Sequence, residues 1–231
     1  ATWNQQAILL GSDSNSGDYF GTRVSLYEDY ALIGAYYAGS RGAAYIFKRN
    51  GSNWAQQQKL IATGGSDAHR FGVSVSLYED YALIGAFGDT SYMGAAYVFK
   101  RNGSTWTQKV KLIANDGSSN DYFGYSVSLY KNYALIGAYG DDSRQGSAYI
   151  FKRNDSNWQQ QDKITVSDGS SNEDFGIFLS LYGDYALIGL YKDNSYKGAA
   201  YIYKLNGLTW NQQQKLTASD GASSDRFGWS V

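Results

Sequence analysis

An eleven-residue stretch, SLYEDYALIGA, occurs at residues 25–35 and again, unchanged, at residues 76–86. Two variants follow, SLYKNYALIGA at residues 128–138 and SLYGDYALIGL at residues 180–190. Because a chain seldom needs the same catalytic group four times, we interpret the repeated stretch as scaffold. The repetition restricts the chain to architectures that use one structural unit several times over.

A Phe-Gly dipeptide marks the same place in every repeat, and a tryptophan stands 17 residues before each one, the first being Trp3. The phenylalanines are spaced by 51, 52, 52 and 52 residues, at Phe20, Phe71, Phe123, Phe175 and Phe227. A period near 50 with fixed landmarks is typical of propellers and solenoids. We therefore treat residues 1–231 as a single domain of four complete repeats and a partial fifth.

Each repeat is predicted to form four short strands, at residues 20–26, 30–35, 42–50 and 54–60 in the first. The first alternates in polarity, and the second, YALIGA, is apolar enough to be covered on both faces. The third and fourth are joined by Asn-Gly, a strong hairpin signal. Tyrosines inside the third strand are expected in the core, at Tyr45, Tyr97, Tyr149 and Tyr201.

Four-stranded units of about 50 residues that repeat radially are propeller blades. The sequence thus predicts an all-β propeller of four-stranded antiparallel blades with a period of about 52 residues and almost no helix. We expect blades near residues 20–61, 71–113, 123–165 and 175–217.

The two ends of the chain repeat each other, because residues 209–231 align without gaps on residues 2–24. Without this overlap, 208 residues remain, which is four units of 52. We favour a segment of a longer array. A compact propeller of four or five blades, and a ring closed by strand exchange with another copy, remain alternatives.

The stretch DYFGYSVSLYKNYALIGAYGDDSRQGSAYIFKRNDSNWQQQ, at residues 121–161, resembles the FG-GAP repeats of integrin α-subunit propellers. It is most similar to versions without a calcium loop in extracellular proteins of microbes. The resemblance extends over nearly the whole chain and implies a propeller used for adhesion or ligand binding, commonly with seven blades. One departure is clear: the Pro of the family's Gly-Ala-Pro is replaced by Tyr36, Phe87, Tyr139 and Tyr191.

Composition excludes several classes of partner. A net charge of −1 gives no general attraction for nucleic acid or anionic membranes, and no apolar run approaches the roughly 18 residues that span a bilayer. The absence of Cys excludes disulfides and thiolate metal sites. We expect no cofactor, no nucleic-acid partner and no membrane span.

No catalytic site is expected. His69 is the only histidine and occupies a place where other repeats have carboxylates, so its role is positional. The turns between first and second strands, around Glu28–Tyr30 and its repeats, are too short to wrap six to eight oxygens around calcium. We predict neither enzyme activity nor a metal there.

A ligand is predicted to contact the loops that join second and third strands. These loops hold the only length change between repeats, and they combine aromatic rings with carboxylates at strand ends. The candidate ligand-binding residues are Tyr36, Phe87, Asp89, Tyr139, Asp141, Tyr191 and Asp193. Two simpler interpretations compete: the rings fill gaps between blades, and the acids accept hydrogen bonds from loop backbone. The second also covers acids two residues before Phe-Gly, at Asp18, Asp121, Glu173 and Asp225.

Asn-X-Ser triplets in the outer turns predict glycosylation at Asn50, Asn102 and Asn154 in a eukaryotic source, although Asn-Gly also suits such a turn by itself. We expect an extracellular or cell-surface module that binds a glycan or protein without catalysis. The alternative is a structural subunit of a filament, sheath or surface layer. Self-association there would use blade faces and the Gln-rich outer strands.

Overall fold

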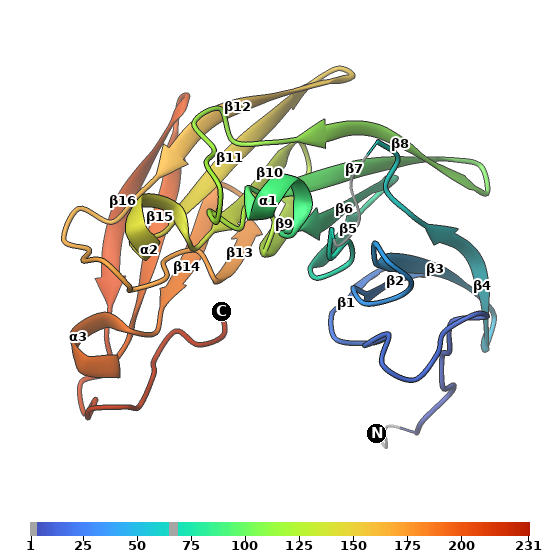
Figure 1. Ribbon diagram of the computed structural model, residues 1–231, viewed down its shortest axis with the longest axis horizontal. Coiled ribbons are helices and arrows are strands. Elements are labelled where there is room, and N and C mark those ends of the chain that lie inside the picture. Colours follow the sequence, from blue (N-terminus) through green and yellow to red (C-terminus); the bar gives the residue numbers. More distant parts are fainter. Residues whose placement is uncertain (1–3, 65–68) are drawn as a thin grey trace.

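The computed structural model describes residues 4–64 and 69–231, so Trp3 lies outside the described residues. Its strands form four antiparallel sheets, each of four strands in chain order. The sheets fan out along an arc that is open between the first and the last (Figure 1). The all-β, four-stranded repeat predicted from the sequence is confirmed.

Sheet 1 contains β1 (Val24–Tyr27), β2 (Tyr30–Ala35), β3 (Ala43–Asn50) and β4 (Asn53–Leu60). Sheet 2 contains β5 (Val75–Tyr78), β6 (Tyr81–Ala86), β7 (Ala95–Asn102) and β8 (Thr105–Leu112). Sheet 3 contains β9 (Ser126–Tyr130), β10 (Tyr133–Ala138), β11 (Ser147–Asn154) and β12 (Asn157–Ile164). Sheet 4 contains β13 (Phe178–Tyr182), β14 (Tyr185–Leu190), β15 (Ala199–Asn206) and β16 (Thr209–Leu216).

The first strand of every sheet lies innermost, and the fourth lies at the outer edge. Inner strands of successive sheets pack together, β1 on β5, β5 on β9 and β9 on β13. The second strands β2 and β6 are buried along their whole length, as expected of strands covered on both faces. The prediction that the Gln-rich fourth strands form the outer rim is also confirmed.

Three short turns follow the second strands of sheets 2, 3 and 4: α1 (Asp89–Tyr92), α2 (Asp141–Arg144) and α3 (Asp193–Tyr196). The sequence showed no helical period and predicted none of them. Their central residues have left-handed backbone angles, for example φ 47° at Thr90 and 56° at Ser91. Such a turn reverses the chain within four residues, which is too short for a hydrophobic period to appear.

Each sheet has a leading face toward the preceding sheet and a trailing face toward the following one. Between sheets 1 and 2, the trailing face supplies Leu32, Ile46 and Leu60. The leading face supplies Ile84 and Tyr97 from sheet 2. Equivalent residues meet between sheets 2 and 3 and between sheets 3 and 4. The four third-strand tyrosines predicted in the core are all fully buried.

A backbone contact attaches each Phe-Gly to the sheet before it. Phe71 pairs in parallel with Gly42, and the same bridge recurs at every later Phe-Gly. A Cβ atom on Gly34 of β2 would lie 2.0 Å from the carbonyl oxygen of Gly72. The ring of Phe71 then packs edge-on against Tyr97 of the next sheet. Each Phe-Gly thus ties one sheet to the next.

No described helix is both long and apolar enough to span a membrane.

We predict that Gly137→Ala strongly destabilises the fold. Its new Cβ would lie 1.9 Å from the carbonyl oxygen of Gly176 and 2.3 Å from Oγ of Ser126. Since that oxygen belongs to bridged backbone, relief requires the sheets to separate. We expect the free energy of unfolding in urea to fall by at least about 3 kcal/mol.

Gly103→Ala is the control, because Gly103 also carries a side chain poorly, at φ 61°, but has open space around it. It should cost about 1–2 kcal/mol. Equal losses for the two variants would show that the close approach does not fix the sheet spacing.

Candidate functional site

The loops between second and third strands hold their first acid in a fixed place. The backbone carbonyl oxygens of Asp89, Asp141 and Asp193 accept hydrogen bonds of 2.9–3.0 Å from the glycine N–H that ends each loop. In the first repeat Ala38 makes the same backbone bond, 3.0 Å to Gly42. The loop geometry is therefore common to all repeats, and the carboxylate is an addition in three of them.

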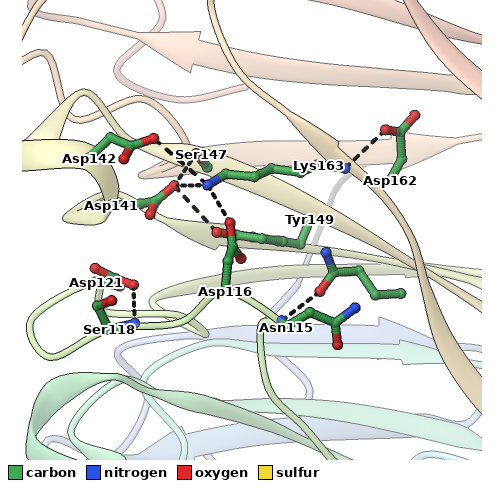
Figure 2. Close-up of polar contacts among 11 residues, drawn as sticks. Asn115, Asp116, Ser118, Asp121, Asp141, Asp142, Ser147, Tyr149, Asp162 and Lys163 are labelled. Carbon is green, nitrogen blue, oxygen red and sulfur yellow. Dashed lines mark hydrogen bonds and ion pairs between the residues drawn. The ribbon is translucent and has the colours of Figure 1, made fainter.

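Figure 2 shows that the carboxylate of Asp141 points into the fold, toward Lys163 of β12. The ammonium lies 2.7 Å from Asp141 and 2.7 Å from Asp116. Asp141 also accepts hydrogen bonds from the hydroxyls of Ser147 and Tyr149. With only 5% of Asp141 exposed, its carboxylate is enclosed by neighbours.

The same lysine position serves the other repeats. Lys111 lies 2.7 Å from Asp89, and Lys215 lies 3.1 Å from Asp193. In the first repeat, where the loop acid is missing, Lys59 lies 2.6 Å from Asp13 instead. Each repeat thus places a lysine ammonium beside at least one carboxylate and over the ring of a buried tyrosine.

These contacts lower the pKa of the carboxylate of Asp116 and raise the pKa of the ammonium of Lys163. Burial is the largest single influence on the pKa of Asp116 and would raise it. The hydrogen bonds from Lys163, the backbone and Tyr149, together with the charge of Lys163, outweigh burial and lower the pKa below its ordinary value. Burial alone would lower the pKa of Lys163, but its bonds to Asp116 and Asp141 raise it instead. The pair is therefore charged across the neutral range.

The acids two residues before Phe-Gly accept hydrogen bonds from loop backbone, which is the simpler of the interpretations drawn from the sequence. Their carboxylates accept backbone N–H bonds of 2.6–2.8 Å from three residues earlier, at Asp18, Asp121, Glu173 and Asp225. Such bonds close a local turn. His69, at the same place in the second repeat, is fully buried with Nδ1 3.8 Å from Asp89.

The aromatic residues of the same loops gather with rings from neighbouring segments. Tyr139 stacks on Tyr122 at 4.7 Å with an interplanar angle of 2°, and meets Tyr125 edge-on at 4.8 Å. Phe87 joins from sheet 2, 5.6 Å from Tyr125 and 6.0 Å from Tyr122. The guanidinium of Arg144 lies 5.4 Å from the Tyr139 ring. We call these five residues the aromatic cluster.

Related groups occur in the first and fourth repeats. Tyr36 lies 5.4 Å from Tyr19 and 4.7 Å from Tyr37. Tyr191 meets Trp229 edge-on at 4.6 Å. Rings of this kind therefore recur at the ends of the second strands.

The aromatic cluster borders a cavity of about 390 Å³ at the centre of the arc. The inner strands of all four sheets contribute to its wall, and so does Tyr125. Tyr125 belongs to both, so the aromatic cluster and the cavity are continuous. Pockets of this size suit small organic groups.

The structure therefore separates the predicted ligand residues into two groups. The carboxylates of Asp89, Asp141 and Asp193 are paired with lysines, with 2%, 7% and 14% of their side chains exposed. The rings Tyr36, Phe87, Tyr139 and Tyr191 remain half-buried at the loop surface. Sequence reasoning missed Tyr122, Tyr125 and Arg144, which stand beside Phe-Gly or at the end of a turn. The sequence signal that could have identified these three residues is that their positions vary between otherwise matched repeats.

The turns between first and second strands also pair their polar residues. Asp29 lies 2.6 Å from Arg49, and Asp80 pairs with Arg101. Asn132 accepts a hydrogen bond from Arg153. The prediction that calcium does not bind there stays a prediction.

We predict that Lys163→Met destabilises the protein by about 2–4 kcal/mol at neutral pH, because it leaves Asp141 enclosed without its cation. The loss should shrink below pH 3.8, the ordinary value for Asp. Asp116 has a lowered folded pKa, so its pairing adds stability above that value and loses it as the pH falls further.

Urea unfolding of both proteins at pH 7 and near pH 3 measures the effect. The exposed Lys109→Met is the matched control and should change stability by no more than about 0.5 kcal/mol. A Lys163→Met loss that does not depend on pH would show that packing, and not charge, explains this position.

Comparison with known families gives five matches to the FG-GAP repeat, at residues 3–47, 54–99, 106–151, 158–203 and 210–231. A search of curated proteins found no match. The matches cover most of the chain and agree in period with the four sheets. The chain belongs to the FG-GAP repeat family.

Proposed function

We propose that this protein is a non-catalytic recognition module that binds a glycan or protein through the aromatic cluster on its loop face. The observation that carries the proposal is the group of half-buried rings, Phe87, Tyr122, Tyr125 and Tyr139, beside a central cavity. Aromatic rings with an apolar body and a polar tip are enriched where proteins bind partners.

The chemistry of the cluster suits a sugar. A tyrosine face can cover the C–H side of a pyranose, while hydroxyl and guanidinium groups bind its hydroxyls. Arg144 is held for that purpose by Asp174, whose carboxylate lies 2.8 Å from its Nε. Since ion pairing and stacking fix these side chains before binding, little entropy is lost when a ligand arrives.

The paired carboxylates make the loops rigid and contribute to binding indirectly. Asp141 holds α2 against Lys163, and α2 carries Arg144 beside Tyr139. Each further repeat offers a related ring surface, so a repetitive ligand could engage several at once. The first repeat, with Ala38 in place of the acid, should bind most weakly.

The proposed location is extracellular or at the cell surface. Asn50, Asn102 and Asn154 stand exposed at the outer hairpin turns, as a glycosylation site requires. Intact mass before and after glycosidase treatment of protein from its natural source decides the glycan part, and recovery from the cytosol would contradict the location.

The second candidate function is a structural subunit of an assembled layer or filament. Its support is the exposed edge that each fourth strand presents at the outer rim. An unpaired edge can add a strand from a neighbour. Contacts through this rim would leave the aromatic cluster free.

We predict that Tyr122→Ala and Tyr139→Ala each weaken ligand binding by about tenfold or more, because each removes one ring of the stacked pair. A glycan array with the isolated protein identifies the ligand, and titration of the variants then measures the loss. The bound glycan should be recovered chemically unchanged.

Gln159→Ala is the control, since Gln159 is exposed on the outer strand β12. It should bind like the unchanged protein. Normal binding by both tyrosine variants, together with loss in Gln159→Ala, would place the contact at the rim and favour the structural role.

A further inference from the structure

The junction between sheets 2 and 3 contains a cavity beside a tryptophan whose equivalents are buried in the two neighbouring junctions. At each junction a tyrosine at the start of a second strand meets, edge-on, the fourth-strand tryptophan of the next sheet. The ring centroids lie 6.0, 6.4 and 5.8 Å apart in the pairs Tyr30 with Trp106, Tyr81 with Trp158, and Tyr133 with Trp210. Trp106 and Trp210 are 2% and 6% exposed, whereas Trp158 is only half-buried.

A fourth-strand glutamine covers the tryptophan in the neighbouring junctions. Gln57 accepts a hydrogen bond of 3.2 Å from the indole N–H of Trp106. Gln161 donates a hydrogen bond to the backbone oxygen of Leu208, two residues before the next tryptophan. Between sheets 2 and 3 the equivalent residue is Lys109, whose ammonium has no acceptor for an indole N–H. Lys109 therefore cannot close this junction as the glutamines close theirs.

The cavity has a volume of about 280 Å³ and is lined by Tyr81, Lys100, Lys109, Asp155, Ser156 and Trp158. These residues carry two aromatic rings, two ammonium groups, one carboxylate and one hydroxyl. They come from β6, β7, β8, β12 and the turn between β11 and β12. A space of this size suits one small ring with polar substituents.

An arginine beside the cavity lacks the carboxylate that neutralises its equivalents. In sheets 1 and 2 the third-strand arginine forms an ion pair with an aspartate, in the pairs Arg49 with Asp29 and Arg101 with Asp80. The equivalent Arg153 donates hydrogen bonds to the amide oxygen of Asn132 and to a backbone oxygen. Since neither oxygen carries a net charge, the charge of the guanidinium is left for another partner.

The cations around the cavity outnumber its carboxylate. The ring of Tyr81 has the ammonium of Lys100 at 5.4 Å and the guanidinium of Arg153 at 4.4 Å from its centre. Within residues 4–64 and 69–231, the ion pairs involve neither Lys100 nor Lys109. Three positive side chains therefore stand against Asp155, and a hollow with such an excess attracts anions.

We propose that this cavity binds an acidic sugar residue, a hexuronate, with its carboxylate among the three cations and its C–H face on Trp158. Ammonium and guanidinium groups bind carboxylates through charge-assisted hydrogen bonds, and an aromatic ring covers an apolar face. Asp155 and Ser156, which also line the cavity, accept hydrogen bonds from the sugar hydroxyls.

Asp155 favours a hydroxylated acid over a simple anion. Its carboxylate repels a small anion, whereas it accepts hydrogen bonds from the hydroxyls of a sugar. The equivalent residues in the other repeats are Gly51, Gly103 and Gly207, and Asp155 keeps their left-handed backbone, at φ 54°. The carboxylate is thus an addition to a turn that does not need it.

The hexuronate site is separate from the aromatic cluster and goes beyond the binding role proposed for that cluster. Tyr81 is the first residue of β6, and Phe87 follows the last one, so the two sites lie at opposite ends of the same strand. The cavity and the aromatic cluster share no residue. The variants Tyr122→Ala and Tyr139→Ala test the cluster by themselves, so either site can fail without the other.

The methyl glycoside of glucuronic acid is the probe, and nuclear magnetic resonance of the full chain measures its binding. The chain has six tryptophans, and Trp158→Phe identifies the indole N–H signal of Trp158. That signal should shift as the probe is added, with its midpoint at about millimolar concentration. The uncharged methyl ester of the same sugar should need about tenfold more, because it lacks the charge that the cations bind.

Four outcomes of this titration would overturn the proposal. The first is an unchanged Trp158 signal at about 50 mM probe, which is weaker than any specific site. The second is a shift confined to other indole signals, which would place the sugar elsewhere. The third is equal binding of the ester. The fourth is an equal shift with acetate, which would show a site for simple anions.

Two variants restore residues that the neighbouring repeats already carry, so both are expected to fold. Lys109→Gln restores the glutamine, and Asn132→Asp restores the partner of Arg153. Each should weaken binding of the probe by about fivefold to tenfold. Lys48→Gln is the control, because Lys48 is exposed and removes the same charge at the junction between sheets 1 and 2. Unchanged binding in Lys109→Gln, or an equal loss in Lys48→Gln, would contradict the assignment.

Discussion

The fold depends on a contact that has no room for a side chain. In every repeat the glycine of the second strand faces the glycine of the next Phe-Gly, so closely that a Cβ atom would lie 1.9–2.0 Å from its carbonyl oxygen. This approach brings the phenylalanine of one repeat into the core of the next sheet. Sheet spacing, the course of the inner strands and the position of the loops all follow from it.

Lysine side chains neutralise the loop carboxylates, a role that a bound cation could have in an acidic loop. Lys111, Lys163 and Lys215 neutralise the loop acids from the neighbouring outer strand. A buried carboxylate without a partner would be costly, and the lysine removes that cost within the chain itself. The loops are therefore held firmly, and their aromatic rings lie half-buried at the loop surface.

Near-identical repeats make near-identical interfaces. Internal interfaces bury one face of each sheet under the next, with equivalent residues at each junction. Repetition thus sets the internal packing between successive sheets.

The sequence alone determined the architecture. Phe-Gly spacing, the apolar second strand and the Asn-Gly turns predicted four-stranded blades, their order and the buried third-strand tyrosines, because these features depend on local periodicity. The acids before Phe-Gly were also predictable as turn-forming acceptors. The partner of each of these acids lies only three positions away.

Only the tertiary structure decided how the candidate site is assembled. Asp141 and Lys163 are 22 positions apart, and the aromatic cluster takes Phe87 from one sheet and Tyr139 from another. A carboxylate beside an aromatic residue looks the same in sequence whether it faces solvent or a lysine. Which of the two occurs depends on how the outer strand returns past the loop, and that course is fixed by packing between sheets.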